Sequence, residues 1–431
     1  MIVTRRTTFR LYPKPAQERK LYEWRRLHCY LYNSALADRK DSYQKLGKSV
    51  GYFDQQNRLP EFKTVWTEFI ELGSQALQAT LKRVDFAFQR FFKGLGGYPR
   101  FQSIRHYSGW SYPATSGWKA HTTGDNGSLE LSNMGQVQMR GKARTWGTPT
   151  TCTIVYRHGK WYASITVKCE PKRKTEDGAV GLDFGTLTAI AVSDGQKIEN
   201  PRYLAATQAK VRQASKQKRR KRAPNRKLRI KGSRRWRKAQ QRVSKLVRKA
   251  ARQRTDWAHK RTAEIVSYNS LVVTEKLNIK GMTSKAKKGK RKRQKTGLNR
   301  SILDVGWGMM RGMLAYKETE ANGIYLEAPT QKLKPSQRCP ECWQVKPKTL
   351  AERIHICDCG CTEDRDVASA KVCLLWARGL GTSLLKDADQ PSSTKSPKHT
   401  GGFRQLAEMK RQKLRNLEDS GLETPSSYEA G

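Results

Sequence analysis

The sequence lacks long apolar runs and has few acidic residues for its length. No stretch approaches the roughly 20 consecutive apolar residues that cross a bilayer, and the start Met1-Ile2-Val3-Thr4-Arg5-Arg6 leads into polar sequence, so we expect neither a membrane span nor a signal peptide. The chain has 37 acidic residues against 86 lysines and arginines, a formal net charge of +49 over 431 residues. Such a chain repels itself unless a polyanion neutralises it, which indicates a nucleic-acid partner.

Cysteine is scarce outside one short segment. Five of the nine cysteines lie in two turns, Cys339-Pro340-Glu341-Cys342 and Cys357-Asp358-Cys359-Gly360-Cys361. Paired cysteine turns across a short hairpin are typical of a zinc ribbon in a reducing compartment rather than of disulfides. Four protein ligands leave no position for water, so such a zinc ion would be structural.

Five cysteines compete for the four zinc positions. Gly360 permits the tight turn in which backbone amides face the preceding sulfur, which favours Cys359 as a ligand. The predicted zinc ligands are Cys339, Cys342, Cys357 and Cys359. Cys361 is the alternate, and His355 is a less favoured substitute.

Three acidic positions, two at strand ends and one at a helix start, are candidate site residues. Asp183 ends the apolar run that begins at Ala179, and Glu275 ends a second run that begins at Leu271. Both runs predict buried strands, and a carboxylate there needs a positive partner. A third acidic group, Asp364-Arg365-Asp366, opens an Ala- and Val-rich run that predicts a helix, where ordinary N-terminal charges are the alternative interpretation.

Carboxylates from two strands and one helix start can together hold two divalent cations. At a separation of about 3.5–4 Å, such a pair supports in-line attack on a phosphodiester, one ion activating water and the other stabilising the leaving oxygen. Oxygen ligands favour Mg²⁺ or Mn²⁺. The sequence therefore predicts a metal-dependent nuclease with an RNase H-like α/β core.

Elsewhere the sequence predicts helices and then strands. Residues 1–12 alternate and predict an edge strand, and Pro15 and Pro60 each open a helical region. Residues 105–170 predict strands, including a hairpin around Arg157–Lys160. Aromatic residues among basic ones between 107 and 118 fit either base stacking or core packing. A lysine-rich loop is expected at 285–295, followed by one helix over Leu298–Lys317.

The segment between Glu199 and Asp256 contains no acidic residue. Its apolar residues keep helical spacing, which predicts a helix with one apolar stripe and an unpaired cationic surface. A solvated face is the ordinary interpretation of a charge run, but this length without a counter-charge favours phosphate contacts.

The order of these motifs resembles the TnpB family, transposon-encoded RNA-guided DNA endonucleases related to type V CRISPR effectors. The matching motifs are Gly181-Leu182-Asp183-Phe184-Gly185, Val272-Val273-Thr274-Glu275, the paired cysteines and Asp364-Arg365-Asp366. Tyr98-Pro99-Arg100-Phe101, Leu298–Ile302 and Ser336–Cys339 match further family segments, and the resemblance covers about residues 1–380. It implies that the catalytic acids are Asp183, Glu275 and Asp366, with Asp364 as a supporting carboxylate.

The resemblance also implies a domain organisation of α/β plus β type. A RuvC nuclease core with an inserted zinc ribbon would follow an N-terminal β-barrel (wedge) domain that is split around a helical recognition domain. The expected ranges are 1–14 and 105–176 for the wedge, 15–104 for the recognition domain, 177–335 and 362–380 for the nuclease core, and 336–361 for the ribbon. The Ser-, Thr-, Pro- and Lys-rich composition of residues 381–431 separately predicts a disordered tail.

The implied activity is cleavage of double-stranded DNA beside a short transposon-associated motif. Its expected cofactors are Mg²⁺ or Mn²⁺ at the nuclease site, Zn²⁺ in the ribbon and a guide RNA from the transposon end. The expected partners are that RNA and the target DNA, with no membrane, in a bacterial cytoplasm and associated with the nucleoid.

Two positions depart from the family pattern. Ala368 stands where the family usually has Asn, and Trp343 stands where Gly commonly follows the first cysteine pair. Ala368 supports an alternative, an RNA-guided DNA-binding protein that no longer cleaves. A transposase lacks a separate sequence feature, and a plain RNA-binding protein would explain the charge but neither the acids nor the cysteines.

Overall fold

The chain folds into two compact units, Met1–Lys172 and Arg173–Gly431. The computed structural model describes residues 2–225, 228–285, 289, 291–349 and 351–379. The expected tail at 381–431 and part of the lysine-rich loop lie outside the described residues. Within the described ranges, no helix is long and apolar enough to cross a membrane.

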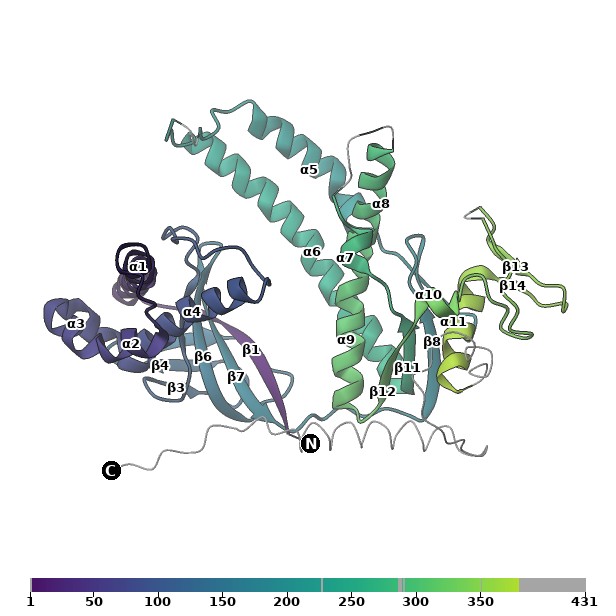
Figure 1. Ribbon diagram of the computed structural model, residues 1–431, viewed down its shortest axis with the longest axis horizontal. Coiled ribbons are helices and arrows are strands. Elements are labelled where there is room, and N and C mark those ends of the chain that lie inside the picture. The colour runs from purple at the N-terminus through teal and green to yellow at the C-terminus, as the bar shows by residue number, and fades with distance from the viewer. Residues whose placement is uncertain (1, 226–227, 286–288, 290, 350, 380–431) are drawn as a thin grey trace. The chain divides into compact units, whose positions relative to one another are not determined.

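The first unit contains a seven-stranded antiparallel sheet with the order β2-β6-β7-β1-β5-β4-β3 (Figure 1). Its strands are β1 Val3–Tyr12, β2 Gly109–Tyr112, β3 Trp118–His121, β4 Gly127–Leu131, β5 Gly135–Arg140, β6 Thr148–Arg157 and β7 Lys160–Cys169. β6 and β7 form the hairpin expected around Arg157–Lys160. Closure of this sheet into a barrel stays a prediction.

The first strand lies inside the sheet, so its prediction as an edge strand is wrong. β1 pairs with β7 from Val3 to Leu11 and with β5 from Arg10 to Tyr12. Both partners come from more than a hundred residues later in the chain, and local alternation carries no information about such pairing.

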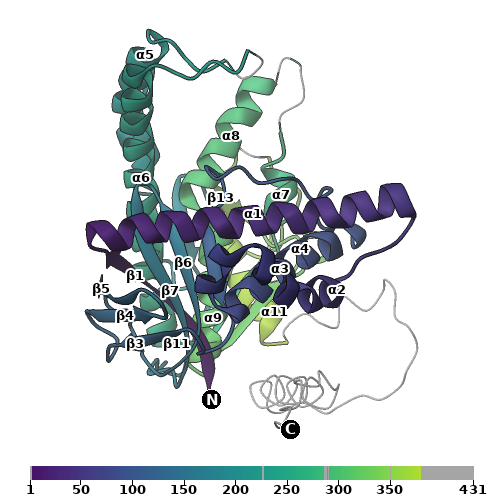
Figure 2. The ribbon, with the colours of Figure 1, turned by 90° about the vertical axis from the view of Figure 1, so that its left-hand side faces the viewer.

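The helices of the first unit share one hydrophobic core with its sheet. They are α1 Pro15–Leu46, α2 Tyr52–Asn57, α3 Leu59–Val65, a 3-10 helix at Thr67–Leu72, and α4 Ser74–Phe92. Pro15 and Pro60 lie in the first turns of α1 and α3, as expected, and Figure 2 shows α1 as one long helix. The aromatics Tyr107, Trp110, Tyr112 and Trp118 are at most 6% exposed. They therefore pack in the core rather than stack on bases.

The second unit contains a five-stranded mixed sheet with the order β10-β9-β8-β11-β12. Its strands are β8 Gly178–Asp183, β9 Thr188–Val192, β10 Lys197–Glu199, β11 Asn269–Glu275 and β12 Ile324–Ala328. β8, β9 and β10 are antiparallel neighbours, whereas β8, β11 and β12 run parallel. The expected strands that carry Asp183 and Glu275 are therefore adjacent.

Helices cover both faces of this mixed sheet. They are α5 Tyr203–Arg219, α6 Arg234–Tyr268, α7 Ile279–Met282, α8 Lys292–Val305, α9 Trp307–Glu320, α10 Thr330–Leu333 and α11 Arg365–Ala377. One core joins Val180 and Val272 to residues of α6, α8 and α9. A second core joins Leu271 and Val273 to residues of α11.

Two helices replace the single helix predicted over Leu298–Lys317. α8 ends at Val305 and α9 begins at Trp307, because Gly306 adopts a left-handed conformation with φ 85°. The apolar spacing continues through the break, so periodicity alone could not show it.

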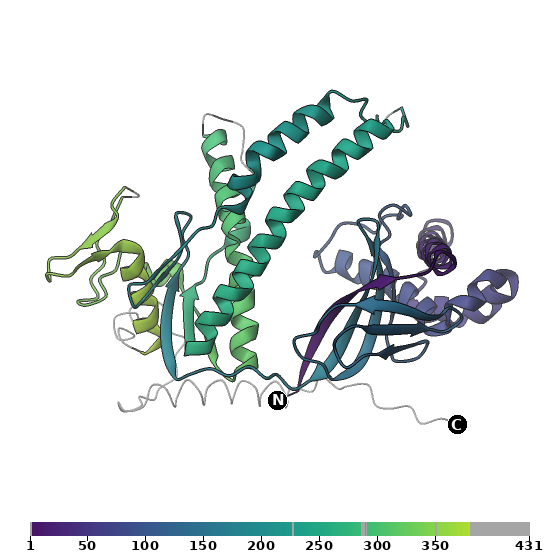
Figure 3. The same ribbon diagram turned by 180° about the vertical axis from the view of Figure 1, so that it is seen from behind.

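The acid-free segment forms a helical hairpin of α5 and α6 (Figures 1 and 3). Every buried residue of α6 lies at or after Ala250, and Ala214 is the buried residue of α5. The hairpin therefore extends beyond the sheet with most of its basic residues exposed to solvent.

Candidate functional site

Two neighbouring strands end in acidic residues. Asp183 is the last residue of β8, and Glu275 is the last residue of β11. The strands are parallel, and Leu182 pairs with Thr274, so the next residue of each strand is an acid. Parallel pairing thus brings together two carboxylates that lie far apart in the sequence.

Both carboxylates face the same side of the sheet. Val180 and Leu182 pack with α6 and α9, whereas Leu271 and Val273 pack with α11. Because successive side chains on a strand alternate between faces, Asp183 and Glu275 both point to the side covered by α11.

A glycine allows α11 to approach β8 closely. A Cβ atom at Gly181 would overlap the carbonyl oxygen of Ala370 in α11. A Cβ at Gly185 would come within 4.0 Å of the Oδ2 atom of Asp366, which lies in the first turn of α11. The helix therefore brings the third predicted acid next to the segment that follows Asp183.

The three acids interact electrostatically. Burial, followed by the carboxylates of Glu275 and Asp366, raises the pKa of Asp183 well above its usual value. Glu275 is 7% exposed, and burial raises its pKa, although a hydrogen bond from Ser369 opposes part of this change. Clustered carboxylates with raised pKa values need a cation to ionise together.

Basic residues orient the start of α11. The Nε and Nη2 atoms of Arg365 donate hydrogen bonds to Oδ1 of Asp366 at 3.2 and 3.1 Å. Asp364 caps the helix by accepting from the backbone N–H groups of Asp366 and Val367, and it forms an ion pair with Lys197 at 2.6 Å. Asp364 thus supports the first turn of α11, and its expected role beside the predicted catalytic acids stays a prediction.

Two further residues at this site, Ser369 and Trp307, were not among those predicted from the sequence. Ser369 is 1% exposed, and its hydroxyl donates to Oε1 of Glu275 at 3.1 Å. It lies three residues after Asp366 in α11, so helical spacing could have identified it. Trp307 donates its indole N–H to the carbonyl of Gly185 at 3.1 Å. No local signal marks that contact, because α9 lies far from Gly185 in sequence.

The arrangement fits divalent cations. The carboxylates of Glu275 and Asp366 both raise the pKa of Asp183, and a positive charge among the three would oppose this effect. Hard oxygen ligands of this kind suit Mg²⁺ or Mn²⁺. The structure brings the three predicted acids together, and their catalytic roles remain predictions.

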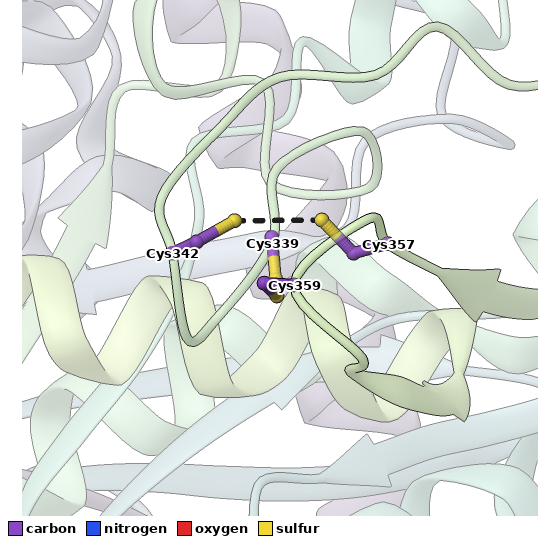
Figure 4. Close-up of side chains that lie close together, drawn as sticks. All are labelled: Cys339, Cys342, Cys357 and Cys359. Atoms are coloured by element: carbon purple, nitrogen blue, oxygen red, sulfur yellow. Dashed lines mark hydrogen bonds between the residues drawn. The ribbon is translucent and has the colours of Figure 1, made fainter.

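The second predicted site is a cluster of cysteines from two turns (Figure 4). The sulfur atoms of Cys339, Cys342, Cys357 and Cys359 all lie within 4.8 Å of one another. Burial alone would raise the pKa of Cys339, but several hydrogen bonds, led by those from the backbone amides of Cys342 and Glu341, together lower it to about 6. A four-sulfur cluster with a readily formed thiolate fits a structural zinc site.

The cysteine cluster is connected directly to the acidic site. Strand β13 Ile354–Ile356 pairs with β14 Thr362–Asp364, and the second cysteine turn joins them. Strand β14 leads into α11 through Asp364. A metal bound by the cysteines would therefore also hold the start of the helix that carries Asp366.

The surface of α6 carries a basic stripe whose members form no ion pair with any other residue that the structure describes. Arg242, Lys245, Lys249 and Arg252 are all exposed, and their spacing places them on one face of the helix. Further along α6, by contrast, Lys260 pairs with Asp256 at 2.9 Å. An unbalanced row of cations suits a phosphate backbone.

Three family models match this chain. A model described as "Probable transposase" (OrfB_IS605) matches residues 162–286, and one described as "Cas12f1-like, TNB domain" matches residues 307–373. A third, described as "Helix-turn-helix domain", matches residues 1–48, which here form β1 and the whole of α1.

Two curated relatives match most of the chain. "Putative RNA-guided DNA endonuclease InsQ" of Escherichia coli (strain K12) is 30% identical over 345 residues, which are 78% of this chain and 82% of the relative. "Putative RNA-guided DNA endonuclease" of Streptomyces pristinaespiralis is 30% identical over 405 residues, 91% of this chain and 94% of the relative.

A solved structure shares the fold. The Cas12f1 protein of a complex with sgRNA and target DNA has a TM-score of 0.54 at 11% identity, and the match covers 86% of this chain and 98% of that chain. The two curated relatives, together with the transposase family model and the motif order, show that the chain belongs to the TnpB family.

Proposed function

We propose that this chain is a transposon-encoded, RNA-guided DNA endonuclease that cleaves double-stranded DNA beside a short transposon-associated motif. The observation that carries the proposal is that Asp183 and Glu275, at the ends of two strands, lie close to Asp366 in the first turn of α11. The names of the two curated relatives support the same activity.

The proposed catalytic core is an RNase H-like RuvC domain, residues 177–335 and 362–380, with the zinc ribbon at 336–361 inserted. Support comes from the mixed sheet, in which antiparallel β10, β9 and β8 are followed by parallel β11 and β12. In the first unit, we assign the wedge to residues 1–14 and 105–176, and the recognition domain to 15–104.

The proposed chemistry uses two divalent cations, Mg²⁺ or Mn²⁺, held by the three carboxylates. When bound, these cations would supply Lewis-acid stabilisation of the charge that develops on the phosphodiester. Glu275 is oriented by Ser369, and Asp366 is held through Oδ1 by Arg365. Trp307 fixes the backbone at Gly185, two residues after Asp183. These contacts position the ligands before substrate binds.

The proposed partners are a guide RNA from the transposon end and the target DNA. Base pairing with the RNA would read the target, while the protein reads the adjacent motif. The net charge of +49 and the basic stripe of α6 are consistent with two polyanions held together. We expect the protein to act in the bacterial cytoplasm near the nucleoid.

A cleavage assay tests this proposal. The protein, bound to RNA from its own transposon end, is incubated with Mg²⁺ and a plasmid library in which randomised bases flank a guide-matched target. We expect cleavage by the wild type and loss of cleavage, with RNA binding retained, in Asp183→Ala. Sequencing of the cleaved plasmids would identify the adjacent motif.

Asp194→Ala provides the matched control. Asp194 is an exposed carboxylate in the turn after β9, where it accepts from the backbone N–H of Gln196. This variant should cleave like the wild type. Cleavage by Asp183→Ala would contradict the assignment. Guided binding without cleavage by the wild type would instead support the second candidate, an RNA-guided DNA-binding protein, for which Ala368 is the motivating residue.

A further inference from the structure

The zinc ribbon contains a second group of metal-binding side chains that overlaps the first. Side-chain ligand atoms of Cys339, His355 and Cys361 lie within 4.8 Å of one another. All three residues are buried, whereas Cys359 of the four-sulfur group is exposed and Cys342 is partly exposed. The two groups share Cys339, so one zinc ion can use either group but not both.

His355 supplies an independent sign of a ligand position. The residue is 0% exposed, and its Nε2 atom has no hydrogen-bond partner among the described residues. Buried polar atoms are nearly always partnered in folded proteins, and a neutral imidazole nitrogen is a common zinc ligand. His355 lies in β13 opposite Glu363, so the strand pairing fixes the backbone that carries the ring.

Lys348 explains why the four-sulfur group would be occupied first. Its Nζ atom contacts Nδ1 of His355. An imidazole that binds zinc through Nε2 carries its proton on Nδ1, where an ammonium group cannot remain in contact. Lys348 must therefore turn toward solvent before His355 can bind zinc, and its partial exposure leaves room for this movement.

We propose that Cys339, His355 and Cys361 form a reserve zinc site, which takes the ion when an exposed cysteine of the four-sulfur group is lost. The three protein ligands leave a fourth position for water, as in open zinc sites. After modification of Cys359, the reserve site would keep zinc in the ribbon. The zinc would continue to hold β14, and with it the start of α11, in place. The inference rests on zinc binding by the wild type.

Substitution of the exposed ligand tests the reserve site. We expect full-length Cys359→Ser to retain about one zinc per chain. Zinc X-ray absorption should show four sulfur neighbours at about 2.3 Å in the wild type, and two sulfurs with at least one nitrogen at about 2.0–2.1 Å in the variant. Lys348→Ala in the Cys359→Ser background should slow the loss of zinc to a chelator.

Double variants identify the ligands. Cys359→Ser/Cys361→Ser and Cys359→Ser/His355→Ala should lose zinc, whereas Cys359→Ser/Cys169→Ser should retain it. Cys169 is a buried cysteine at the end of β7 in the other unit and serves as the matched control. If Cys359→Ser does not fold, Cys342→Ser tests the same transfer from the first cysteine turn.

Each result has a defined meaning. Loss of zinc by both Cys359→Ser and Cys342→Ser would overturn the reserve site while leaving the four-sulfur site and the nuclease intact. Retention through three sulfurs, unaffected by the change at Cys361, would overturn it as well. A wild type without zinc would refute both zinc sites, and the cleavage assay with Asp183→Ala would still decide the proposed activity.

Discussion

At the residue scale, cation binding at the acidic site should depend on pH, because protons and the cation compete for the same carboxylates. Burial and the neighbouring acids raise the pKa of Asp183, so the metal-free folded site keeps protons that the unfolded chain releases. Between the ordinary carboxyl pKa of 3.8 and the raised folded value, rising pH therefore lowers the free energy of unfolding. A divalent cation bound at the proposed site would remove this penalty by displacing the protons.

The first expected outcome concerns Mg²⁺ removal. Thermal unfolding of the wild type should show stabilisation by Mg²⁺ that grows with pH, reaching about 2.7 kcal/mol at a free concentration near 100 Kd. In Asp183→Asn, which cannot titrate at this position, both the stabilisation and its pH dependence should shrink. Equal stabilisation of the two proteins at every pH would contradict a carboxylate metal site.

Ser369 is a positioning residue, because it acts through Glu275. Removing its hydroxyl in Ser369→Ala takes away the hydrogen bond that opposes the rise in the pKa of Glu275. We expect the cleavage rate to fall by roughly 10-fold or more, the acid limb of the pH–rate profile to move to higher pH, and DNA binding to stay unchanged. Ser267→Ala, at an exposed serine of α6, is the control. A uniform fall in rate with an unmoved pH profile would indicate a packing role only.

At the scale of elements, the close approach of α11 to β8 depends on one glycine. In Gly181→Ala, the new methyl group meets the carbonyl oxygen of Ala370, so the helix and Asp366 must move away from Asp183. We expect a loss of about 1–3 kcal/mol in the free energy of unfolding of the second unit, together with loss of cleavage.

Gly312→Ala is the matched control for this change. Gly312 lies within α9, and an added Cβ has nothing within 4 Å. Because alanine favours a helix interior over glycine by roughly 0.5–1 kcal/mol, this variant should be slightly stabilised in chemical denaturation. If Gly181→Ala were also slightly stabilised, the close packing of Gly181 against the Ala370 carbonyl would not determine the position of α11.

Element prediction from the sequence succeeded where the signal was local. The strands that end at Asp183 and Glu275, the hairpin of β6 and β7, and the helix starts at Pro15 and Pro60 all follow from periodicity and breakers. The edge position of β1 and the single helix over Leu298–Lys317 were wrong. Both depend on contacts between residues far apart in the sequence: the strands that pair with β1, and the packing that separates α8 from α9 at Gly306.

At the scale of the whole molecule, the net charge of +49 should make nucleic-acid affinity strongly dependent on salt. Changing Arg242, Lys245, Lys249 and Arg252 together to Glu should weaken RNA binding. If all four contact phosphates, the slope of log affinity against log salt should decrease by roughly 3. Lys260→Glu, at a lysine that already pairs with Asp256, should change the slope little. An unaltered slope in the fourfold variant would show that the stripe is an ordinary solvated surface that does not contact phosphates.

The sequence by itself determined the chemistry available to this protein: two acids at the ends of apolar runs, a third acid at a helix start, two cysteine turns and a large cationic excess. These features are read locally, from residue type and spacing. Only the tertiary structure decided that β8 and β11 are neighbours, that α11 crosses β8 at Gly181, and that Ser369 meets Glu275. The physical reason is that periodicity specifies which face of an element is apolar, whereas the partner of that face is selected by packing across the whole unit.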